Sequence, residues 1–236
     1  MVLLQKEIKR ITIRPNGTEK QIRPVWTPWA NTILYIPMDT DFLDHSGNNY
    51  QWDGWHWTYS IQTVNGVNAW YWSWWYIRFT WLTDLKANSW TCCVWLKNLL
   101  TSNRRETYSY LSASNSNNAH SSTLITNWWK YWAATNLYGS YDVISQTSWM
   151  NTNWHLVTTT CNGTNLSIYV DNWQPYQASV TNNNNNFVLC DVWSRNDVYT
   201  TQYRYWYLSK FIVENKVRTA TEISDYYNFT KWNYWL

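Results

Sequence analysis

Short runs of β-branched and aromatic residues recur along the chain, separated by residues such as Asn, Ser, Thr and Gly. In residues 165–171, Leu166, Ile168 and Val170 alternate with residues of more polar character. A period of two places one set of side chains on the buried face of a strand. The pattern therefore predicts an antiparallel β-protein with little helix.

The predicted strands share this enrichment in β-branched and aromatic residues. They are Ile8–Arg14, Thr32–Pro37, Tyr76–Thr80, Thr91–Lys97, Thr107–Ser112, His155–Thr160, Asn165–Asp171, Phe187–Cys190 and Tyr205–Val213. Asn162-Gly163 between two of them predicts a hairpin, because both residues tolerate positive φ. Residues 219–228 are predicted to form one short amphipathic helix, and the Asn run at 182–186 a loop tip.

The basic residues are concentrated at the N-terminus. Residues 1–24 contain six Lys or Arg and two Glu, whereas the whole chain carries a net charge of +3. The net charge of the chain after residue 24 is therefore close to zero, whereas a nucleic-acid-binding protein has a strongly positive surface. We predict a basic arm over residues 1–25, which joins the protein to a larger assembly, and one sandwich domain over residues 26–236.

Two further features bear on the location of the protein. No stretch reaches the roughly 18 consecutive apolar residues of a membrane span, and the apolar start ends at Gln5-Lys6-Glu7, so no signal peptide is legible. The cysteines lack metal-ligand spacing. We interpret all four as free thiols: Cys92, Cys93, Cys161 and Cys190. The alternative is a disulfide between Cys161 and Cys190.

The chain has 22 Trp and 6 Gly, although Gly averages about 7% of residues in proteins. Several Trp occupy positions where a turn favours Gly. One hypothesis is that most of them represent UGA codons that the source organism reads as glycine. The alternative is a genuine Trp-rich surface that stacks on sugars. Under the first hypothesis we expect exposed side chains in turns or at strand ends for Trp70, Trp72, Trp74, Trp75, Trp173 and Trp206.

Four segments occur in the order found in a known superfamily. They are Leu34–Asp39 with Asp44–Asn48, Val94–Lys97, Trp154–Val157 with residues 162–173, and Tyr207–Val213. Over roughly residues 30–236 the chain resembles the concanavalin A-like lectin/glucanase superfamily, in its laminin-G-like bacterial branch. The resemblance implies an all-β, two-sheet antiparallel jelly-roll sandwich with one short C-terminal helix. It also implies that Trp95 and Trp154 are genuine tryptophans, which we expect to be buried.

The resemblance further implies a carbohydrate or protein ligand at the concave face or loop rim, often with calcium. The candidate residues for sugar stacking are Trp128, Trp129, Tyr131 and Trp132. Asp44 and Asn48 could supply oxygen ligands to calcium, and a solvated turn is the alternative for them. The acidic pair of the family's last strand is replaced by Ser209-Lys210, so a calcium site on that strand is not expected.

Catalytic residues are not apparent. Retaining glycanases need two carboxylates about 5 Å apart, and none of the five Glu pairs with another acid at strand spacing. The four His are isolated in the sequence and are expected to be structural: His45, His56, His120 and His155. We predict a non-enzymatic carbohydrate-binding or adhesion domain of a surface or phage structural protein, located outside the cell or on a virion, whose partner is a glycan or a surface protein. The alternatives are a structural domain without its own ligand and, more remotely, a degenerate glycanase.

Overall fold

The computed structural model describes most of the chain after the basic arm. The described residues are 30–38, 41–53, 59–72, 77–80, 82, 85, 89–98, 106–112, 119–126, 130–137, 140–149, 151–179, 189–192 and 206–234. The arm over residues 1–25, the strand Ile8–Arg14 and the loop at 182–186 therefore lie outside the described part. Within this part no helix has the length and apolar character needed to cross a membrane.

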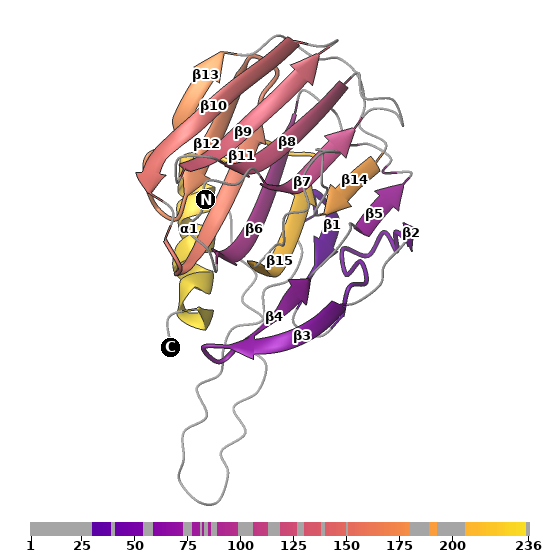
Figure 1. Cartoon of the computed structure of the whole chain (residues 1–236). Coiled ribbons are helices and arrows are strands. Elements are labelled where there is room, and N and C mark those ends of the chain that lie inside the picture. The colour runs from indigo at the N-terminus through magenta and orange to yellow at the C-terminus, as the bar shows by residue number, and fades with distance from the viewer. Residues whose placement is uncertain are drawn as a thin grey trace, which may run out of the picture.

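The strands form two antiparallel sheets (Figure 1). The first sheet has the order β13(Tyr176–Ser179), β12(Asn165–Val170), β11(Trp154–Cys161), β6(Trp90–Asn98), β15(Trp206–Glu214), β4(Val67–Trp72) and β3(Tyr59–Val64), and β1(Thr32–Ile36) also pairs with β15. The second has the order β10(Ser140–Trp149), β9(Lys130–Leu137), β8(Ala119–Thr126), β7(Glu106–Ser112), β14(Leu189–Val192), β5(Ile77–Thr80) and β2(Trp52–Asp53).

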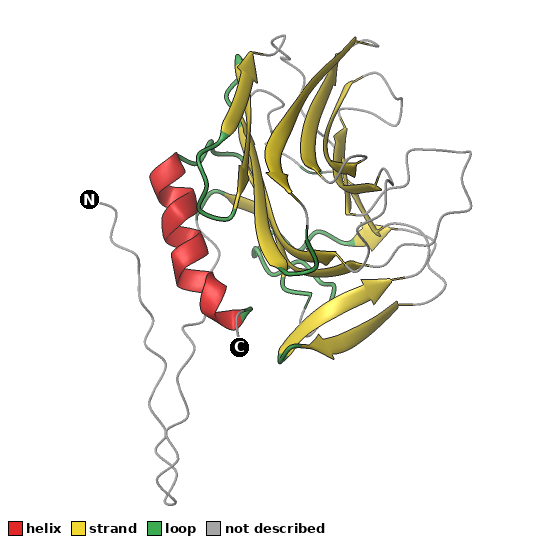
Figure 2. Cartoon of the chain, turned by 60° about the vertical axis from the view of Figure 1, so that its left-hand side comes forward, coloured by secondary structure: helices red, strands yellow, loops and turns green. Residues whose placement is uncertain are grey.

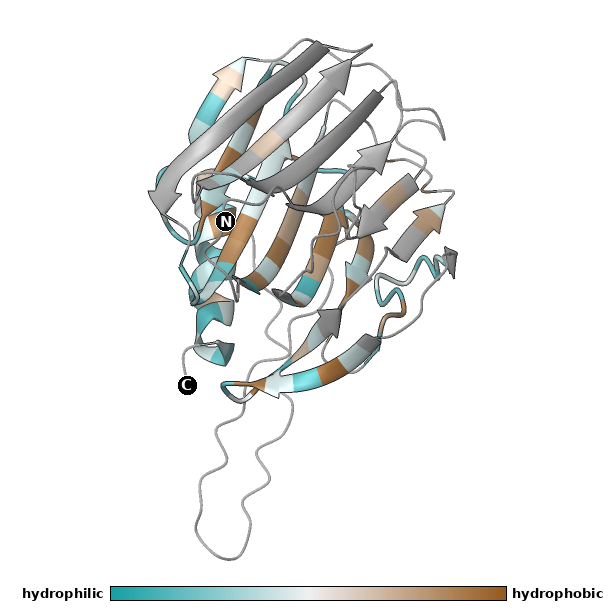
Figure 3. Ribbon diagram, in the orientation of Figure 1, coloured by the Kyte–Doolittle hydropathy of each residue, from teal (hydrophilic) through white to brown (hydrophobic). Residues whose placement is uncertain are grey.

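The main hydrophobic core lies between these sheets. The predicted inward face of β12, Leu166, Ile168 and Val170, is buried there, together with Phe79 and Cys190 of the second sheet. Hydrophobic residues also recur along the central strands of the first sheet (Figure 3). The prediction of a mostly β, antiparallel protein is confirmed, because period-two alternation identifies a strand. The expectation of a single buried face on β12 is wrong, since Ser167 and Tyr169 between these residues are buried as well.

A second, smaller core lies on the outer face of the first sheet, under the helix α1(Ala220–Thr230) and the short η1(Lys231–Asn233) (Figure 2). Trp95 stacks on Tyr234, with ring centroids 4.1 Å apart, and its indole N–H donates to Thr230 Oγ1 at 3.0 Å. Trp154 also contacts Tyr234. Both tryptophans are buried, as predicted.

The C-terminal helix begins where a local signal places it. Thr219 is the N-cap, its side chain accepts a hydrogen bond from the Glu222 backbone N–H, and the Glu222 side chain accepts one from the Thr219 N–H. This capping box satisfies two backbone donors that the helix itself leaves unpaired. The predicted helix over 219–228 is therefore confirmed, with its end shifted to Thr230.

The tryptophans divide into buried and exposed groups. Trp70 in β4 is buried beside Phe42, so the expectation of exposure is wrong for this position, because the strand directs Trp70 into the core between the sheets. Trp90 is buried as well. Trp173 is 61% exposed, as expected. The backbones of Trp72 and Trp206 lie in strands, whereas their side chains, and all of Trp74 and Trp75, lie outside the described part.

Backbone geometry bears on the recoding hypothesis. Among the described residues, positive φ angles outside glycine occur at Met38, Asn49, Asn65, Asp171 and Lys210, and none of these is a tryptophan. Only a positive φ makes glycine strongly preferable. The described tryptophan positions therefore do not require glycine for backbone reasons. The four cysteines are free, as predicted, and the structure shows that they are also buried.

Candidate functional site

Three polar residues meet where β11 begins and β12 ends: Asn151, His155 and Asp171. The β11–β12 hairpin brings them together. Its turn contains Gly163 at φ 89°, and its register opposes Val157 to Val170, which places residue 155 beside the end of β12. The predicted Asn-Gly hairpin is thus confirmed, and it builds this site.

The imidazole of His155 is held on both sides. Nδ1 lies 2.7 Å from Asp171 Oδ2, and Nε2 lies 2.9 Å from Asn151 Oδ1. Asp171 Oδ1 also accepts the backbone N–H of Leu156, and Asn151 Oδ1 accepts that of Asn153. The side chains of His155 and Asp171 are each 12% exposed. The cluster therefore forms a rigid polar rim at the edge of the sandwich.

This rim fixes a turn that presents Trp173 to solvent. Asp171 has φ 55° and donates its N–H to Leu156 O, and the Trp173 N–H donates to Val170 O at 3.2 Å. Asp tolerates this left-handed conformation better than most residues. Because the Asp171 carboxylate is bound to His155, the turn is anchored to β11. Asn172 and Trp173 then extend from the anchored turn as exposed residues.

Tyr131 of the second sheet closes the inner side of the rim. Its ring is edge-on to His155, with centroids 5.9 Å apart, and it is fully buried. Burial raises the pKa of Tyr131 well above its usual value, and the negative charge of Asp171 adds to this shift. A buried ring cannot stack on a sugar from solvent, so this part of the predicted sugar site is wrong. The side chain of Trp132, with all of Trp128 and Trp129, lies outside the described part.

The loop proposed for calcium closes onto β1 instead. Asp44 Oδ1 accepts the N–H groups of Tyr35 and Ser46, and Oδ2 accepts the Ser46 hydroxyl and the Tyr50 N–H, at 2.8 to 3.1 Å. Asn48 Nδ2 donates to the carbonyl oxygen of Ile33 at 2.9 Å. Protein donors thus occupy both Asp44 oxygens, which calcium would need.

These contacts favour the alternative, a turn, over calcium ligation by Asp44 and Asn48. In the described part of the chain, no three His, Cys, Asp or Glu side chains are grouped in a way that could hold a metal ion.

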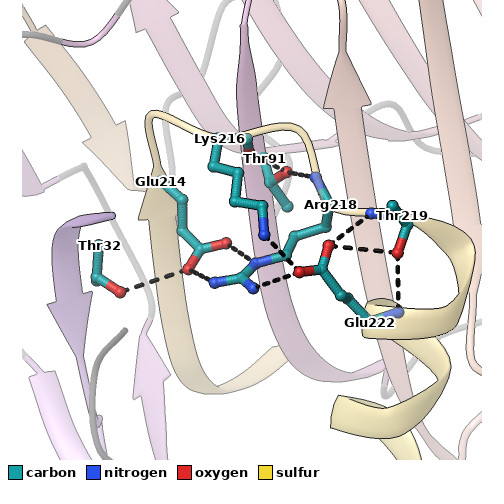
Figure 4. A network of polar contacts seen from close by, with 7 residues as sticks. All are labelled: Thr32, Thr91, Glu214, Lys216, Arg218, Thr219 and Glu222. Carbon is teal, nitrogen blue, oxygen red and sulfur yellow. Dashed lines mark hydrogen bonds and ion pairs between the residues drawn. The ribbon is translucent and has the colours of Figure 1, made fainter. Parts of the chain in front are cut away.

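A further polar cluster anchors the C-terminal helix (Figure 4). Arg218 binds both carboxylate oxygens of Glu214, through Nε at 2.5 Å and Nη2 at 2.6 Å, and donates from Nη1 to Glu222 at 3.2 Å. Lys216 also binds Glu222. The Arg218 N–H donates to Thr91 Oγ1 on β6. This network connects β15, β6 and α1, and we call it the helix anchor.

The pKa values of the two glutamates in the helix anchor shift in opposite directions. Burial raises the pKa of Glu214, although its hydrogen bonds with Arg218 partly offset the shift. Burial alone would raise the pKa of Glu222 as well, but hydrogen bonds from Lys216 and the Thr219 N–H, with the charge of Arg218, lower it overall. Both glutamates are engaged by cations, and in addition Glu214 accepts from the Thr32 hydroxyl and Glu222 from the Thr219 N–H. Their arrangement indicates a structural role.

The two antiparallel sheets and the covering helix define a β-rich fold that solved structures share. One similar structure is that of botulinum neurotoxin type C, whose cell entry is dependent upon interaction with two ganglioside molecules. It matches with a TM-score of 0.70 and 14% identity, and the match covers 84% of this chain and 51% of that chain. The binding domain of Paraclostridial Mosquitocidal Protein 1 matches with TM-score 0.67 at 12% identity over 84% and 52%.

A third similar structure is the binding domain of botulinum neurotoxin DC in complex with rat synaptotagmin II, with TM-score 0.67 at 13% identity over 84% of this chain and 51% of that chain. The chain thus spans about half the length of these structures. No protein-family description and no curated protein match the sequence. The likeness to binding domains concerns the fold.

Proposed function

We propose that this protein is a non-enzymatic carbohydrate-binding or adhesion domain of a surface or phage structural protein, and that it acts outside the cell or on a virion. The observation that carries the proposal is the exposed indole of Trp173 on a turn anchored by Asp171 and His155. An aromatic ring held rigidly at a polar rim is a good platform for the apolar face of a sugar. Its position costs little to fix on binding, because the turn is already ordered.

Two further observations support this assignment. Asn151 in the rim and Asn172 beside it are both exposed, and their side-chain amides carry N–H groups that can donate to sugar hydroxyls. The structures with a similar fold include a neurotoxin whose cell entry is dependent upon interaction with two ganglioside molecules and a binding domain in complex with rat synaptotagmin II. The partner we propose is therefore a glycan or a surface protein.

The finer assignment rests on the sequence. We infer a concanavalin A-like jelly roll of the laminin-G-like branch, with the sandwich over residues 26–236 and the basic arm over 1–25 as the connection to a larger assembly. Trp128 and Trp129 directly precede β9, the strand that carries Tyr131 beside His155, so we include them with Trp132 in the proposed binding surface.

A glycan array with the full chain tests the proposal, in the presence and absence of calcium. We expect binding to a subset of glycans under both conditions, and a loss of about tenfold or more in affinity for Trp173→Ala, since aromatic contacts contribute roughly 1 kcal/mol beyond the area they bury. Leu43→Ala is the matched control, because Leu43 is an exposed hydrophobic residue in the loop after β1. Absence of binding by the unmodified protein would refute the proposal and favour a purely structural domain. Unchanged binding by Trp173→Ala would refute the site at Trp173 and place the glycan elsewhere on the protein.

A further inference from the structure

The strand β3 ends the first sheet on the side away from the proposed binding site. Its neighbour among the described strands is β4, which itself pairs with β15 only at Trp70 and Tyr71. The β3–β4 hairpin therefore extends beyond the rest of the sheet (Figure 2). The opposite end of the sheet is β13, a shorter strand that contacts β10 of the second sheet. Of these two edges, β3 is the one beside which the described part of the chain places no further element.

The hairpin turn determines which backbone groups β3 presents outward. Asn65 at φ 52° and Gly66 at φ 76° form a two-residue turn of the type with two positive φ angles, closed by the pair Val64 and Val67. This closing pair exchanges hydrogen bonds, and such pairs alternate along an antiparallel ladder. Ser60, Gln62 and Val64 thus bond to β4. The N–H and C=O groups of Tyr59, Ile61 and Thr63 point away from it.

The strand β3 itself carries none of the residues that usually prevent strand pairing. The strand reads Tyr-Ser-Ile-Gln-Thr-Val, without a charged residue, Pro or Gly. Ile61 is 38% exposed, and Ser60 and Thr63 are exposed as well. Natural edge strands are commonly protected by Lys, Pro or a bulge. An uncharged edge rich in β-formers therefore indicates a surface that pairs with another strand.

We propose that β3 pairs with β3 of a second copy of this chain, antiparallel, around a two-fold axis at Ile61. The three residues with outward backbone groups are symmetric about Ile61. In this register Ile61 opposes Ile61 of the second copy, and Tyr59 opposes Thr63, so every outward N–H and C=O group finds a partner. The central pair, Ile with Ile, is favourable across strands.

The dimer would join the first sheets of two copies into one continuous sheet. Each copy would contribute one rim with Trp173, which lies toward the edge of the sheet opposite to β3. Two linked sites raise the apparent affinity for a surface that displays many copies of a ligand, without any new contact. The pairing itself depends only on β3 and stands whether or not the rim binds glycans.

The first test is the mass of the full chain in solution, measured by sedimentation equilibrium. We expect a dimer for the unmodified protein and a monomer for Ile61→Lys, which places two ammonium groups against each other at the axis. Because Ile61 is exposed at the edge, the far-UV circular dichroism of the variant should match that of the unmodified protein. A monomeric unmodified protein, or a dimeric Ile61→Lys, would overturn the proposal.

The second test fixes the register. Residues of a hydrogen-bonded antiparallel pair have Cα atoms about 5.5 Å apart, within the range that a disulfide spans. Ile61→Cys should therefore form a covalent dimer on mild oxidation. Ser60→Cys, the matched control, opposes Gln62 of the second copy and should not. The native cysteines are all buried and do not compete. Equal crosslinking of both variants, or none by Ile61→Cys, would overturn this register.

Discussion

The helix anchor offers a direct test of how the C-terminal helix is held. Arg218 is 7% exposed and Glu214 fully buried, and the two side chains share a bidentate contact. Arg218→Met keeps an unbranched apolar side chain but removes every charged donor to Glu214. The Glu214 carboxyl group must then stay ionised without its partner or bind a proton, and in both cases the folded state becomes less stable.

The expected magnitude follows from the burial of the pair. Removing one partner of a buried ion pair costs about 3–5 kcal/mol, against a total stability of about 5–15 kcal/mol for a typical domain. Replacing both partners by apolar residues is often close to neutral. Arg218→Met combined with Glu214→Leu should therefore recover most of the stability lost in the single variant. Lys216→Met is the matched control, because its pair with Glu222 is more exposed and should contribute less than about 1 kcal/mol.

Guanidinium denaturation at neutral pH, followed by far-UV circular dichroism, gives the free energy of unfolding of each variant. The reasoning is refuted if Arg218→Met costs less than about 1 kcal/mol, since the pair would then be solvated despite its burial. It is also refuted if the double variant is no more stable than Arg218→Met alone. That result would mean that packing around Arg218, and not its charge, holds the helix.

Three further predictions concern the pH response, the loop after β1 and the tryptophans. The lowered pKa of Glu222 stabilises the fold above the usual pKa of Glu, about 4.3, and this contribution is lost as pH falls through the lower folded value. Glu222→Gln keeps the capping box, so its stability deficit in denaturation curves should be present at pH 7 and shrink progressively as the pH falls below the usual pKa of Glu. Asp44→Ala should lower the melting temperature, since four donors lose their acceptor, and a chelator should leave the melting temperature of the unmodified protein unchanged; a drop on chelation would restore the calcium hypothesis. For protein isolated from its native source, the recoding hypothesis predicts an intact mass below that of the sequence by whole multiples of the Trp–Gly difference. A mass that accounts for all 22 tryptophans would refute it and retain the indole of Trp173 in the native site.

Local signals were sufficient for some elements. The β11–β12 hairpin followed from Asn162-Gly163 between two alternating runs, and the helix followed from Thr219 and its neighbours. Asn65-Gly66 carries the same turn signal between β3 and β4, and the prediction missed that hairpin because the flanking segment is crowded with tryptophan. The strands β8, β9 and β10 were missed as well. Their Ser, Thr and Asn content is as typical of loops as of strands, and pairing in the second sheet decides between the two.

The candidate site shows a similar division. His155 looked isolated, and counting pairs outward from the hairpin turn places it opposite Asn172, whereas Asp171 lies opposite Leu156. The contact with Asp171 arises because Asp171 leaves the strand with φ 55°, which the pairing pattern alone does not indicate. Nothing in the sequence indicates that Tyr131 of another sheet would lie edge-on to His155. For this reason the sequence could not distinguish an exposed sugar-stacking ring from a buried one.

The sequence by itself determined the β class, the C-terminal helix and one hairpin, because alternation, capping and turn chemistry act between residues close together in the chain. Only the tertiary structure decided which strands are neighbours, such as β6 between β11 and β15. It also decided that Asp44 holds a turn against β1 and that Glu214 pairs with Arg218 in a site closed by Thr32. These outcomes depend on contacts between distant segments, where burial and hydrogen-bond satisfaction outweigh the local preference of any one residue.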